Sequence, residues 1–208
     1  MKQLLSYIVI IALLPNPVFA EGQPVFVEKK ITKEALKELQ KGGFVIYMRH
    51  GNSDTAHPDQ VPRVDLNDCT TQRPLTETGR QVAAGIGNSI RKLHIPVGEI
   101  ISSPMCRAKE SAQAAFGENF TLDNNLMYTS NMTYLEKLPI LQETRILLSK
   151  PVPDGSNRVL VSHAPNLMDL VGYFPNPEGA VIIFKPVRKK GFEYIGTIPP
   201  QQWQLFLK

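Results

Sequence analysis

The chain has 208 residues, a length that favours one globular domain over two. Hydrophobic residues make up 42% and charged residues 20% of it, which is a normal globular balance and excludes a largely disordered chain. The formal net charge is +4, and the basic residues are scattered apart from one cluster between residues 185 and 190. This pattern argues against nucleic acid as a partner, while a mild positive charge favours encounter with an anionic substrate.

The first twenty residues have the pattern of a signal peptide. Lys2 gives a positive start, Leu4 to Leu14 is a nearly unbroken apolar run, and Val18-Phe19-Ala20 has small residues where a signal peptidase reads. The apolar run is shorter than the roughly 20 residues of a spanning helix, which weighs against a membrane anchor. We therefore expect cleavage after Ala20, a domain from Glu21 to Lys208 without a stable membrane span, and a periplasmic or secreted protein.

Strands and helices are predicted to alternate along the chain. Thr32 can cap a short helix over 33–40, and the apolar run at 44–48 is typical of a strand buried on both faces. The polar stretch 52–74 predicts a long loop, and loops of this length are usually functional. Apolar residues at helical spacing predict a helix over 76–93, which leads to a strand over 99–103.

The second half of the chain continues this alternation. A helix carrying Arg107 is expected to begin at Pro104, because proline suits a first helical turn. The elements expected after it are a helix over 134–150, a strand over 158–161, a short helix over 165–171, a strand pair over 181–184 and 192–198, and a last helix with Trp203 on its inner side. The order predicts an α/β sheet covered by helices on both faces.

Three of the predicted strands end in residues of the same chemical kinds. The first leads into Arg49 and His50, the second into Arg107 one helical turn later, and the third into His163. Ligands bind beyond the carboxyl ends of strands in open α/β sheets, so neighbouring parallel strands would bring these four side chains into one crevice. Guanidinium groups match phosphate oxygens, and a neutral imidazole can attack phosphorus. The pattern therefore predicts a phosphoryl-transfer site.

Four segments in this order resemble the signature of the histidine phosphatase superfamily. They are Met48-Arg49-His50-Gly51, Pro74-Leu75-Thr76-Glu77-Thr78-Gly79, Ser102-Ser103-Pro104-Met105-Cys106-Arg107-Ala108 and Ser162-His163-Ala164-Pro165. The resemblance implies a phosphoglycerate mutase-like fold, a three-layer α/β/α sandwich with a mostly parallel sheet. It implies that His50 accepts the phosphoryl group, that Arg49, Arg107 and His163 complete the pocket, and that no metal or organic cofactor is used.

The resemblance also bears on the substrate. It implies a small phosphorylated compound as the substrate. In its expected export and its small size, the chain is similar to the phosphatases that act on a phosphosugar of the cell envelope. Many members supply a carboxylic acid to the leaving group, but Ala164 and Leu126-Met127-Tyr128 stand where two branches carry it. The remaining candidates are Asp54 and Glu178, of which we favour Asp54, because its loop must border the pocket. The missing acid argues against a mutase.

Several alternatives stay open at this point. Arg73 is a candidate for substrate binding, with a surface role as the other interpretation. His50, Asp54 and His57 could be read as metal ligands, although two nearby arginines would repel a cation. We predict a phosphatase that acts on a phosphomonoester or similar compound through a phosphohistidine. The alternatives are a non-catalytic phospho-ligand-binding protein and a phosphohistidine-directed protein phosphatase, whose substrate needs no acid.

The two cysteines of the chain, Cys69 and Cys106, lie close in sequence to the residues of the predicted site. An exported protein can form disulfides, because its compartment is oxidising. Sequence spacing does not fix the distance between the two thiols. A structural disulfide and a pair of half-buried free thiols therefore both remain possible.

Overall fold

The computed structural model describes residues 26–188 and 191–208, so the expected signal peptide lies outside the described residues. One six-stranded sheet has the order β3-β2-β4-β1-β5-β6. The strands are β1 (Val45–Arg49), β2 (Val97–Ser102), β3 (Thr121–Leu122), β4 (Asn157–Ser162), β5 (Val181–Val187) and β6 (Gly191–Ile198). The first four strands pair in parallel, and β5 is antiparallel to both β1 and β6. The predicted mostly parallel sheet is confirmed.

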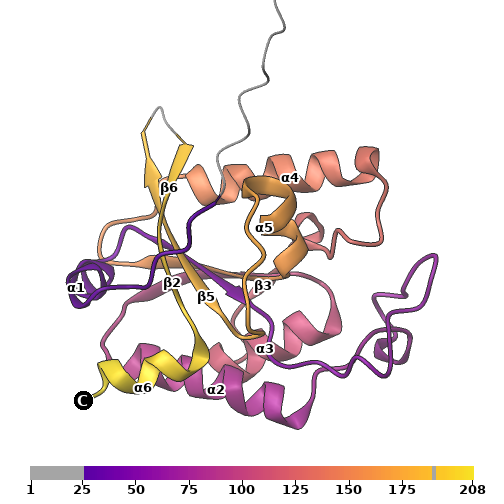
Figure 1. Cartoon of the computed structure of the whole chain (residues 1–208), viewed down its shortest axis with the longest axis horizontal. Helices are drawn as coiled ribbons and strands as arrows, with labels where there is room; N and C mark the ends of the chain where they lie inside the picture. Colours follow the sequence, from indigo (N-terminus) through magenta and orange to yellow (C-terminus); the bar gives the residue numbers. More distant parts are fainter. Residues whose placement is uncertain (1–25, 189–190) are drawn as a thin grey trace, which may run out of the picture.

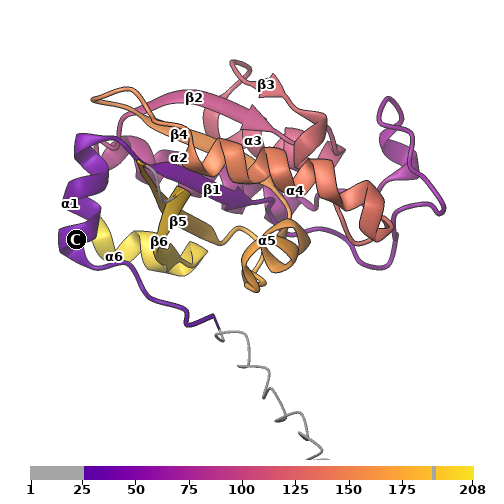
Figure 2. The same cartoon turned by 90° about the horizontal axis from the view of Figure 1, so that it is seen from above.

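Helices cover both faces of this sheet, as Figures 1 and 2 show. They are α1 (Lys33–Lys41), α2 (Glu77–Lys92), α3 (Cys106–Phe116), α4 (Tyr134–Ser149), α5 (Ala164–Val171) and α6 (Trp203–Phe206), with 3₁₀ turns η1 (Cys69–Thr71), η2 (Asn124–Leu126) and η3 (Pro200–Gln202). In Figure 1, α4 and α5 lie on one side of the sheet, and α2, α3 and α6 lie on the other. The three-layer α/β/α arrangement is therefore confirmed.

The two faces of the sheet build two separate clusters of buried side chains. In β1, Ile46 and Met48 point to the face that α2 and α3 cover, while Val45 and Tyr47 point to the face that α4 and α5 cover. Successive side chains of a strand point to opposite faces, so a strand buried on both faces must be apolar throughout. The apolar run before Arg49 thus reflects the central place of β1 between β4 and β5.

Most helices begin close to the residues where the sequence predicts them, although a few boundaries differ from the prediction. The side chain of Thr76 caps α2 by accepting a hydrogen bond from the Gly79 amide, and Thr133 with Glu136 forms a capping box on α4. The helix expected from Pro104 begins instead at Cys106. The strand β3 was not expected, since its two residues are exposed and carry no apolar pattern.

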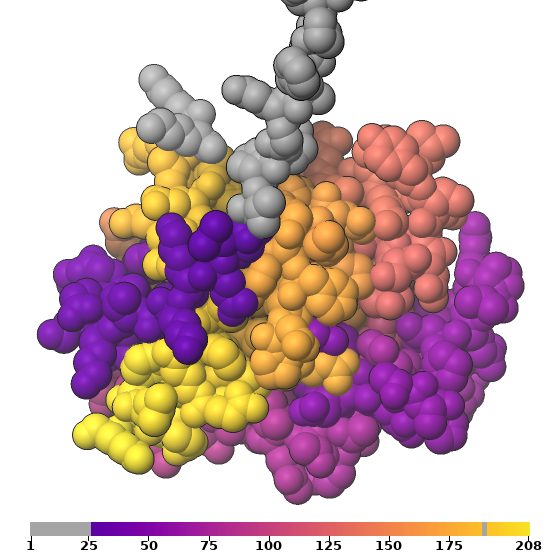
Figure 3. Space-filling model, in the orientation of Figure 1, coloured from indigo at the N-terminus to yellow at the C-terminus, as the bar shows by residue number. Residues whose placement is uncertain are grey.

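The first and last described segments lie beside each other, as the indigo and yellow surfaces in Figure 3 show. Lys30 forms a parallel bridge with Thr197 of β6, and the ring of Phe26 stacks on Tyr173 with centroids 4.3 Å apart. The chain before α1 is thereby fixed beside β6, an edge strand of the sheet. In residues 26–188 and 191–208, no helix is long and apolar enough to cross a membrane.

Candidate active site

Three neighbouring parallel strands deliver the predicted residues to one edge of the sheet. Arg49, at the end of β1, is in register with Ser162 at the end of β4, and the His50 amide donates a hydrogen bond to the Ser162 carbonyl at 3.0 Å. His163 follows Ser162 directly, so the two histidine rings meet with their centroids 5.3 Å apart. The expected convergence of the first and third strands is therefore what the structure shows.

Arg107 reaches the same place from α3, which follows β2 on the other side of β4. Its guanidinium carbon lies 4.9 Å from the ring centroid of Tyr128, and that same ring meets the ring of His163 edge-on at 5.5 Å. The side chain of Arg107 is fully buried. Arg49, His50, Arg107 and His163 therefore surround one space, although the sequence separates them widely.

The ring of His50 is held in one tautomer. Its Nδ1 lies 2.8 Å from the Gly51 carbonyl oxygen, which can only accept a hydrogen bond. Nδ1 therefore carries the proton, and the lone pair of the ring is on Nε2. Burial lowers the pKa of His50 well below its usual value, and the charge of Arg107 lowers it further. The imidazole is consequently neutral at physiological pH and can act as a nucleophile through Nε2.

The ring of His163 contacts the hydroxyl group of Ser103. The Ser103 hydroxyl accepts a hydrogen bond from the Met105 amide at 3.3 Å and lies 2.9 Å from Nε2 of His163. When this hydroxyl donates its own proton to Nε2, the ring proton of His163 is on Nδ1, which has no other partner among the described residues. Burial, followed by the charge of Arg107, lowers the pKa of His163 well below its usual value. His163 is thus a neutral donor through Nδ1.

Arg49 and Arg73 share one carboxylate, that of Glu178. Nη2 of Arg49 lies 3.2 Å from Oε1 of Glu178, and Nη2 of Arg73 lies 3.8 Å from the same oxygen. Ser53 fixes this carboxylate with its amide at 2.9 Å and its hydroxyl at 2.7 Å. Arg73, for which a surface role was the alternative, has a side chain only 19% exposed. The structure therefore places Arg73 in the cluster.

A second carboxylate, Asp59, holds Arg107. Nη1 of Arg107 donates to Oδ1 of Asp59 at 2.8 Å, and the Arg73 amide donates to the same oxygen at 2.8 Å. The side chain of Asp59 is 7% exposed. Sequence reasoning missed this residue, because nothing in the sequence distinguishes it from the other three aspartates of the 23-residue polar loop. With Asp59 and Glu178 set against three guanidinium groups, the cluster retains one excess positive charge.

Buried nitrogen atoms in this cluster lack hydrogen-bond partners among the described residues. They are Nε of Arg49, Nε of Arg73, Nε and Nη2 of Arg107, and Nδ1 of His163. An unpartnered buried polar group costs about 1–3 kcal/mol, and more when it is charged. Five such atoms on four side chains around His50 are best explained by an anionic ligand with several oxygens.

Two glycines of the sequence motifs meet backbone to backbone. A Cβ on Gly51 would lie 2.3 Å from the Gly79 carbonyl oxygen, and a Cβ on Gly79 would lie 2.1 Å from the Asn52 carbonyl oxygen. Neither position can accept a side chain without moving the backbone. The start of α2 therefore packs directly on the residue after His50, which explains why the two motifs occur together.

The structure does not bring Asp54 into this cluster. Its carboxylate accepts hydrogen bonds from His57 Nδ1 at 2.7 Å and from the Ala56 amide at 2.9 Å, and its side chain is 38% exposed. The hydrogen bond from His57, followed by that from Ala56, lowers the pKa of Asp54, whereas a proton donor needs a raised one. These contacts do not favour Asp54 as the proton donor to the leaving group, and that role stays a prediction.

The contacts of His57 also bear on the metal alternative. His57 and Asp54 bind each other at the surface, while His50 lies buried against Gly51. Within the described ranges, no group of three or more histidine, cysteine, aspartate or glutamate side chains could hold a metal ion. The set of His50, Asp54 and His57 is therefore not assembled as a metal site.

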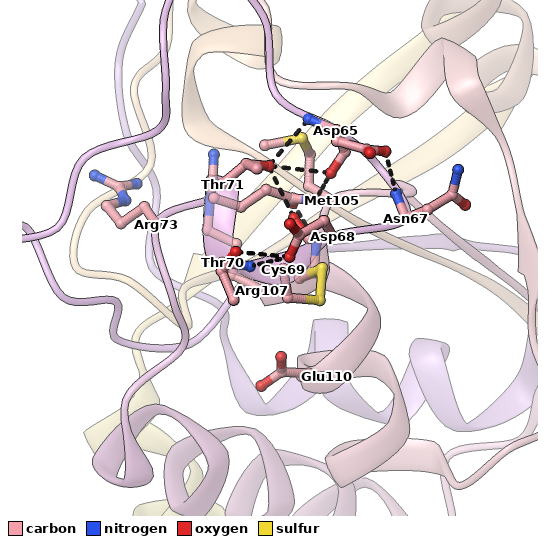
Figure 4. The surroundings of a disulfide bond; sticks show 12 residues. Asp65, Asn67, Asp68, Cys69, Thr70, Thr71, Arg73, Met105, Arg107 and Glu110 are labelled. Atoms are coloured by element: carbon pink, nitrogen blue, oxygen red, sulfur yellow. Dashed lines mark hydrogen bonds between the residues drawn. A yellow bond between two sulfur atoms is a disulfide. The ribbon is translucent and has the colours of Figure 1, made fainter.

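A disulfide joins the long loop to the helix that carries Arg107 (Figure 4). Cys69 and Cys106 are bonded, with their Cα atoms 5.7 Å apart, so the disulfide alternative is confirmed over free thiols. Beside it, Oε1 of Gln72 accepts a hydrogen bond from the Cys106 amide at 2.8 Å. These two links hold the segment before Arg73 against the first turn of α3.

Fold and site together define a protein of the α/β class with a buried cluster of two neutral histidines and three arginines. The sequence model of the histidine phosphatase superfamily (branch 1) matches residues 45–130. No curated protein sequence matches the chain. The matched residues include Arg49, His50 and Arg107, so this part of the chain is similar to the histidine phosphatase superfamily.

Several solved structures share the fold at low sequence identity. The protein histidine phosphatase SixA complexed with tungstate is 17% identical over 76% of this chain and 97% of that one, with a TM-score of 0.52. Phosphoserine phosphatase from Entamoeba histolytica in complex with 3-phosphoglyceric acid is 16% identical over 77% and 98%, with a TM-score of 0.54. The alpha-ribazole phosphatase from Shigella flexneri is 12% identical over 76% and 96%, also with a TM-score of 0.54.

Proposed function

We propose that the protein is a phosphatase that hydrolyses a phosphomonoester or a similar phosphoryl compound through a phosphohistidine on His50. The observation that carries this proposal is the set of five unpartnered buried nitrogen atoms around a neutral imidazole. Guanidinium groups bind phosphate oxygens and keep their charge at any working pH. A neutral histidine lies beside them, and the lone pair on its Nε2 can attack phosphorus. A protein that only binds an anion does not need this lone pair.

In the first half of the reaction, Nε2 of His50 attacks the phosphorus atom. The bond from phosphorus to the leaving oxygen breaks, and that oxygen keeps the electron pair and takes up a proton from solvent. Arg49, Arg107 and Nδ1–H of His163 donate to the equatorial oxygens, where charge remains as the leaving group departs. The hydrogen bond from Nδ1 of His50 to Gly51 disperses the positive charge that forms on the ring.

In the second half, a water molecule attacks the phosphorus of the phosphohistidine. The phosphorus–nitrogen bond breaks, its electron pair returns to Nε2 of His50, and a proton of the water is released to solvent. The net reaction converts the ester and one water into an alcohol and inorganic phosphate. No residue changes its bonding over the full cycle, so His50 is ready for another substrate.

The carboxylates of the site favour substrates with good leaving groups. Asp59 pairs with Arg107, Glu178 pairs with Arg49, and Asp54 is bound to His57. None of them is positioned as an uncommitted proton donor. The histidine released from a phosphohistidine, or the carboxylate released from an acyl phosphate, can depart without a proton donor. A phosphohistidine-directed activity is therefore the second candidate. The SixA structure, which binds tungstate, belongs to an enzyme named for phosphohistidine and supports this alternative at the level of the fold.

The decisive experiment combines turnover with trapping of the intermediate. Purified protein is assayed with p-nitrophenyl phosphate beside His50→Ala, with exposed His57→Ala as the matched control. We expect His50→Ala to lose activity and His57→Ala to keep it. Rapid quenching with a labelled substrate should trap phosphohistidine at His50. Full activity in His50→Ala would overturn the proposal, and vanadate binding without turnover of any ester would indicate a phospho-ligand-binding protein.

We also propose that the protein works outside the cytoplasm, in the periplasm or after secretion. The residues 1–20 support this by their pattern, and the disulfide between Cys69 and Cys106 supports it because such bonds persist in oxidising compartments. Expression in a bacterium followed by fractionation and N-terminal sequencing tests it. A mature chain beginning at Glu21 is expected, and an intact Met1 in the cytoplasmic fraction would contradict it.

A further inference from the structure

A cavity of about 340 Å³ adjoins the phosphate pocket. It lies between the loop 52–74, the segment after η2 and the first turn of α4, and Arg63 of the loop pairs with Glu136 of α4 at 3.7 Å. Figure 2 shows this loop beyond the carboxyl ends of the strands. Its volume is within the range of about 300–1,000 Å³ that is typical of small-molecule sites.

Two residues belong to both the cavity and the phosphate pocket. Asp59 lines the cavity and accepts a hydrogen bond from Nη1 of Arg107, and Tyr128 lines it with the ring that contacts Arg107 and His163. A phosphoryl group bound by Arg107 would therefore have its substituent beside Asp59 and Tyr128. The cavity is the space into which that substituent can extend.

The lining of the cavity is mainly apolar. Besides the ring of Tyr128, its walls include the side chains of Met105, Met127, Met132, Val64 and Leu66. Methionine side chains are flexible and polarisable, so they adapt to apolar groups of different shapes. A hydroxyl group placed among them without a partner would lose its hydrogen bonds to water at a cost. We call this space the methionine cavity.

We propose that the methionine cavity binds the apolar aryl group of a phosphate monoester whose phosphoryl group lies against His50. A phenolate is a good leaving group, as a site without an uncommitted proton donor requires. This inference rests on the proposed function and names the class of its substrate. It favours a hydrophobic phosphate ester over the phosphosugar that the sequence suggested, because most of the lining is apolar. Of the polar side chains in the lining, Arg63 and Glu136 pair with each other and Asp59 pairs with Arg107, which leaves Gln60 and Asn131 for the hydroxyl groups of a sugar.

The test measures binding, so that it does not depend on turnover. Ethyl-, butyl- and hexylphosphonate are titrated into the full protein by calorimetry, with 2,3-dihydroxypropylphosphonate as a hydroxylated ligand. Each added methylene that enters the cavity should lower Kd by about fourfold, until the space is filled. Butylphosphonate should bind more tightly than the hydroxylated ligand. Equal Kd values along the series, or preference for the hydroxylated ligand, would overturn the inference.

Two variants test whether the dependence of Kd on chain length arises in the methionine cavity. Leu66→Asn and Met132→Gln nearly preserve side-chain volume, lie at half-buried positions and should each reduce the dependence of Kd on chain length. Leu205→Asn, the same change at a 60% exposed position of α6, should keep the dependence. Thermal unfolding of each variant shows that it is folded. An unchanged chain-length dependence in both cavity variants would contradict the assignment.

Hydrolysis of 1-naphthyl phosphate separates this inference from the proposed function. If longer phosphonates bind more tightly but the naphthyl ester is not hydrolysed, the proposed role of the methionine cavity is supported and the proposed phosphatase activity is refuted. Hydrolysis without any dependence of binding on chain length would support the phosphatase and refute the role of the cavity. The result expected from both proposals is hydrolysis of the naphthyl ester together with tighter binding of longer phosphonates.

Discussion

The guanidinium group of Arg107 donates a hydrogen bond to the carboxylate of Asp59 across 2.8 Å, with both side chains almost fully buried. This pair stands between the phosphate pocket and the methionine cavity. The carboxylate takes up one of the donors that a phosphate would use, and its charge repels phosphate oxygens. Asp59 therefore competes with the ligand for Arg107 while it compensates the buried charge.

We predict that Asp59→Asn binds phosphate more tightly. The change removes one negative charge beside the ligand and keeps a side-chain oxygen for Arg107. Unit charges a few ångströms apart interact by several kcal/mol near a protein surface, so even a fraction of this energy gives about a tenfold lower Kd. Calorimetric titration with phosphate measures it.

Asp54→Asn is the matched control in the same loop. Its carboxylate contacts His57 and Ala56, so the change should leave both phosphate affinity and turnover of p-nitrophenyl phosphate as they are. Weaker phosphate binding in Asp59→Asn would show that the carboxylate mainly positions Arg107. A large loss of turnover in Asp54→Asn would return that residue to the role of proton donor.

Reduction of the disulfide should destabilise the protein and weaken its phosphate site. Cys69 and Cys106 close a loop with a sequence separation of 37. In the chain-entropy model such a crosslink contributes roughly 4 kcal/mol to the free energy of unfolding. Urea unfolding with and without reductant measures this loss. Phosphate affinity should fall as well, because Arg73 and Asp59 belong to the loop that the bond secures.

A double variant controls for other effects of the reductant. The chain with Cys69→Ser and Cys106→Ser should show the lower stability from the outset and should not respond to reductant. If the wild-type protein unfolds at the same urea concentration in both redox states, the disulfide contributes nothing to stability. If stability falls while phosphate affinity stays constant, the loop holds its position through Gln72 and its other hydrogen bonds.

Stability is expected to fall as the pH drops below about 6.5. Burial lowers the pKa of His50 and His163 in the folded protein, so below their unfolded pKa the unfolded chain binds protons that the folded protein does not. Each histidine can contribute up to about 1.4 kcal/mol per pH unit. Carboxylates titrate at a lower pH, about 4. The loss of stability between about pH 6.5 and 5 is therefore attributed to these two histidines.

Urea unfolding at a series of pH values checks this dependence. His163→Asn should remove about half of the slope between pH 6.5 and 5, because one of the two titrating groups is gone. His57→Asn changes an exposed histidine and should leave the slope intact. A wild-type protein equally stable at both ends of this window would contradict the neutral, buried state of the two rings.

Gly79→Ala should be strongly destabilising and should displace His50. The added Cβ would lie 2.1 Å from the Asn52 carbonyl oxygen, so either α2 or the loop after Gly51 must move. Gly85→Ala, in the same helix, has nothing within 4 Å of its Cβ and should stabilise the helix by roughly 0.5–1 kcal/mol. Thermal unfolding compares the two variants, and equal effects would contradict the close contact at Gly79.

Much of the architecture could be predicted from the sequence, for identifiable reasons. The run ending at Met48 is apolar throughout, because β1 is buried on both faces, and this pattern is local. The caps at Thr76 and Thr133 are local as well. The convergence of His50 and His163 could be predicted because parallel neighbouring strands end at the same edge of a sheet.

The rest of the site depends on contacts that leave no local pattern. Asp59 reaches Arg107 from an irregular loop whose path is set by the disulfide and by Gln72. Ser103 contacts Nε2 of His163 only because β2 and β4 are neighbours. Asp54, favoured for its closeness in sequence to His50, points instead to His57, because a short aspartate side chain is satisfied by its immediate surroundings.

The strand order has a consequence for how the protein is made. His50 follows β1, yet both hydrogen-bonded neighbours of that strand, β4 and β5, come from the last third of the chain. During synthesis, the segment ending in His50 leaves the ribosome long before residues 157–187 exist to pair with it. A nascent or truncated chain that stops before β4 thus lacks His163 and the strands beside β1, so the proposed phosphate site can form only once the polypeptide is nearly finished.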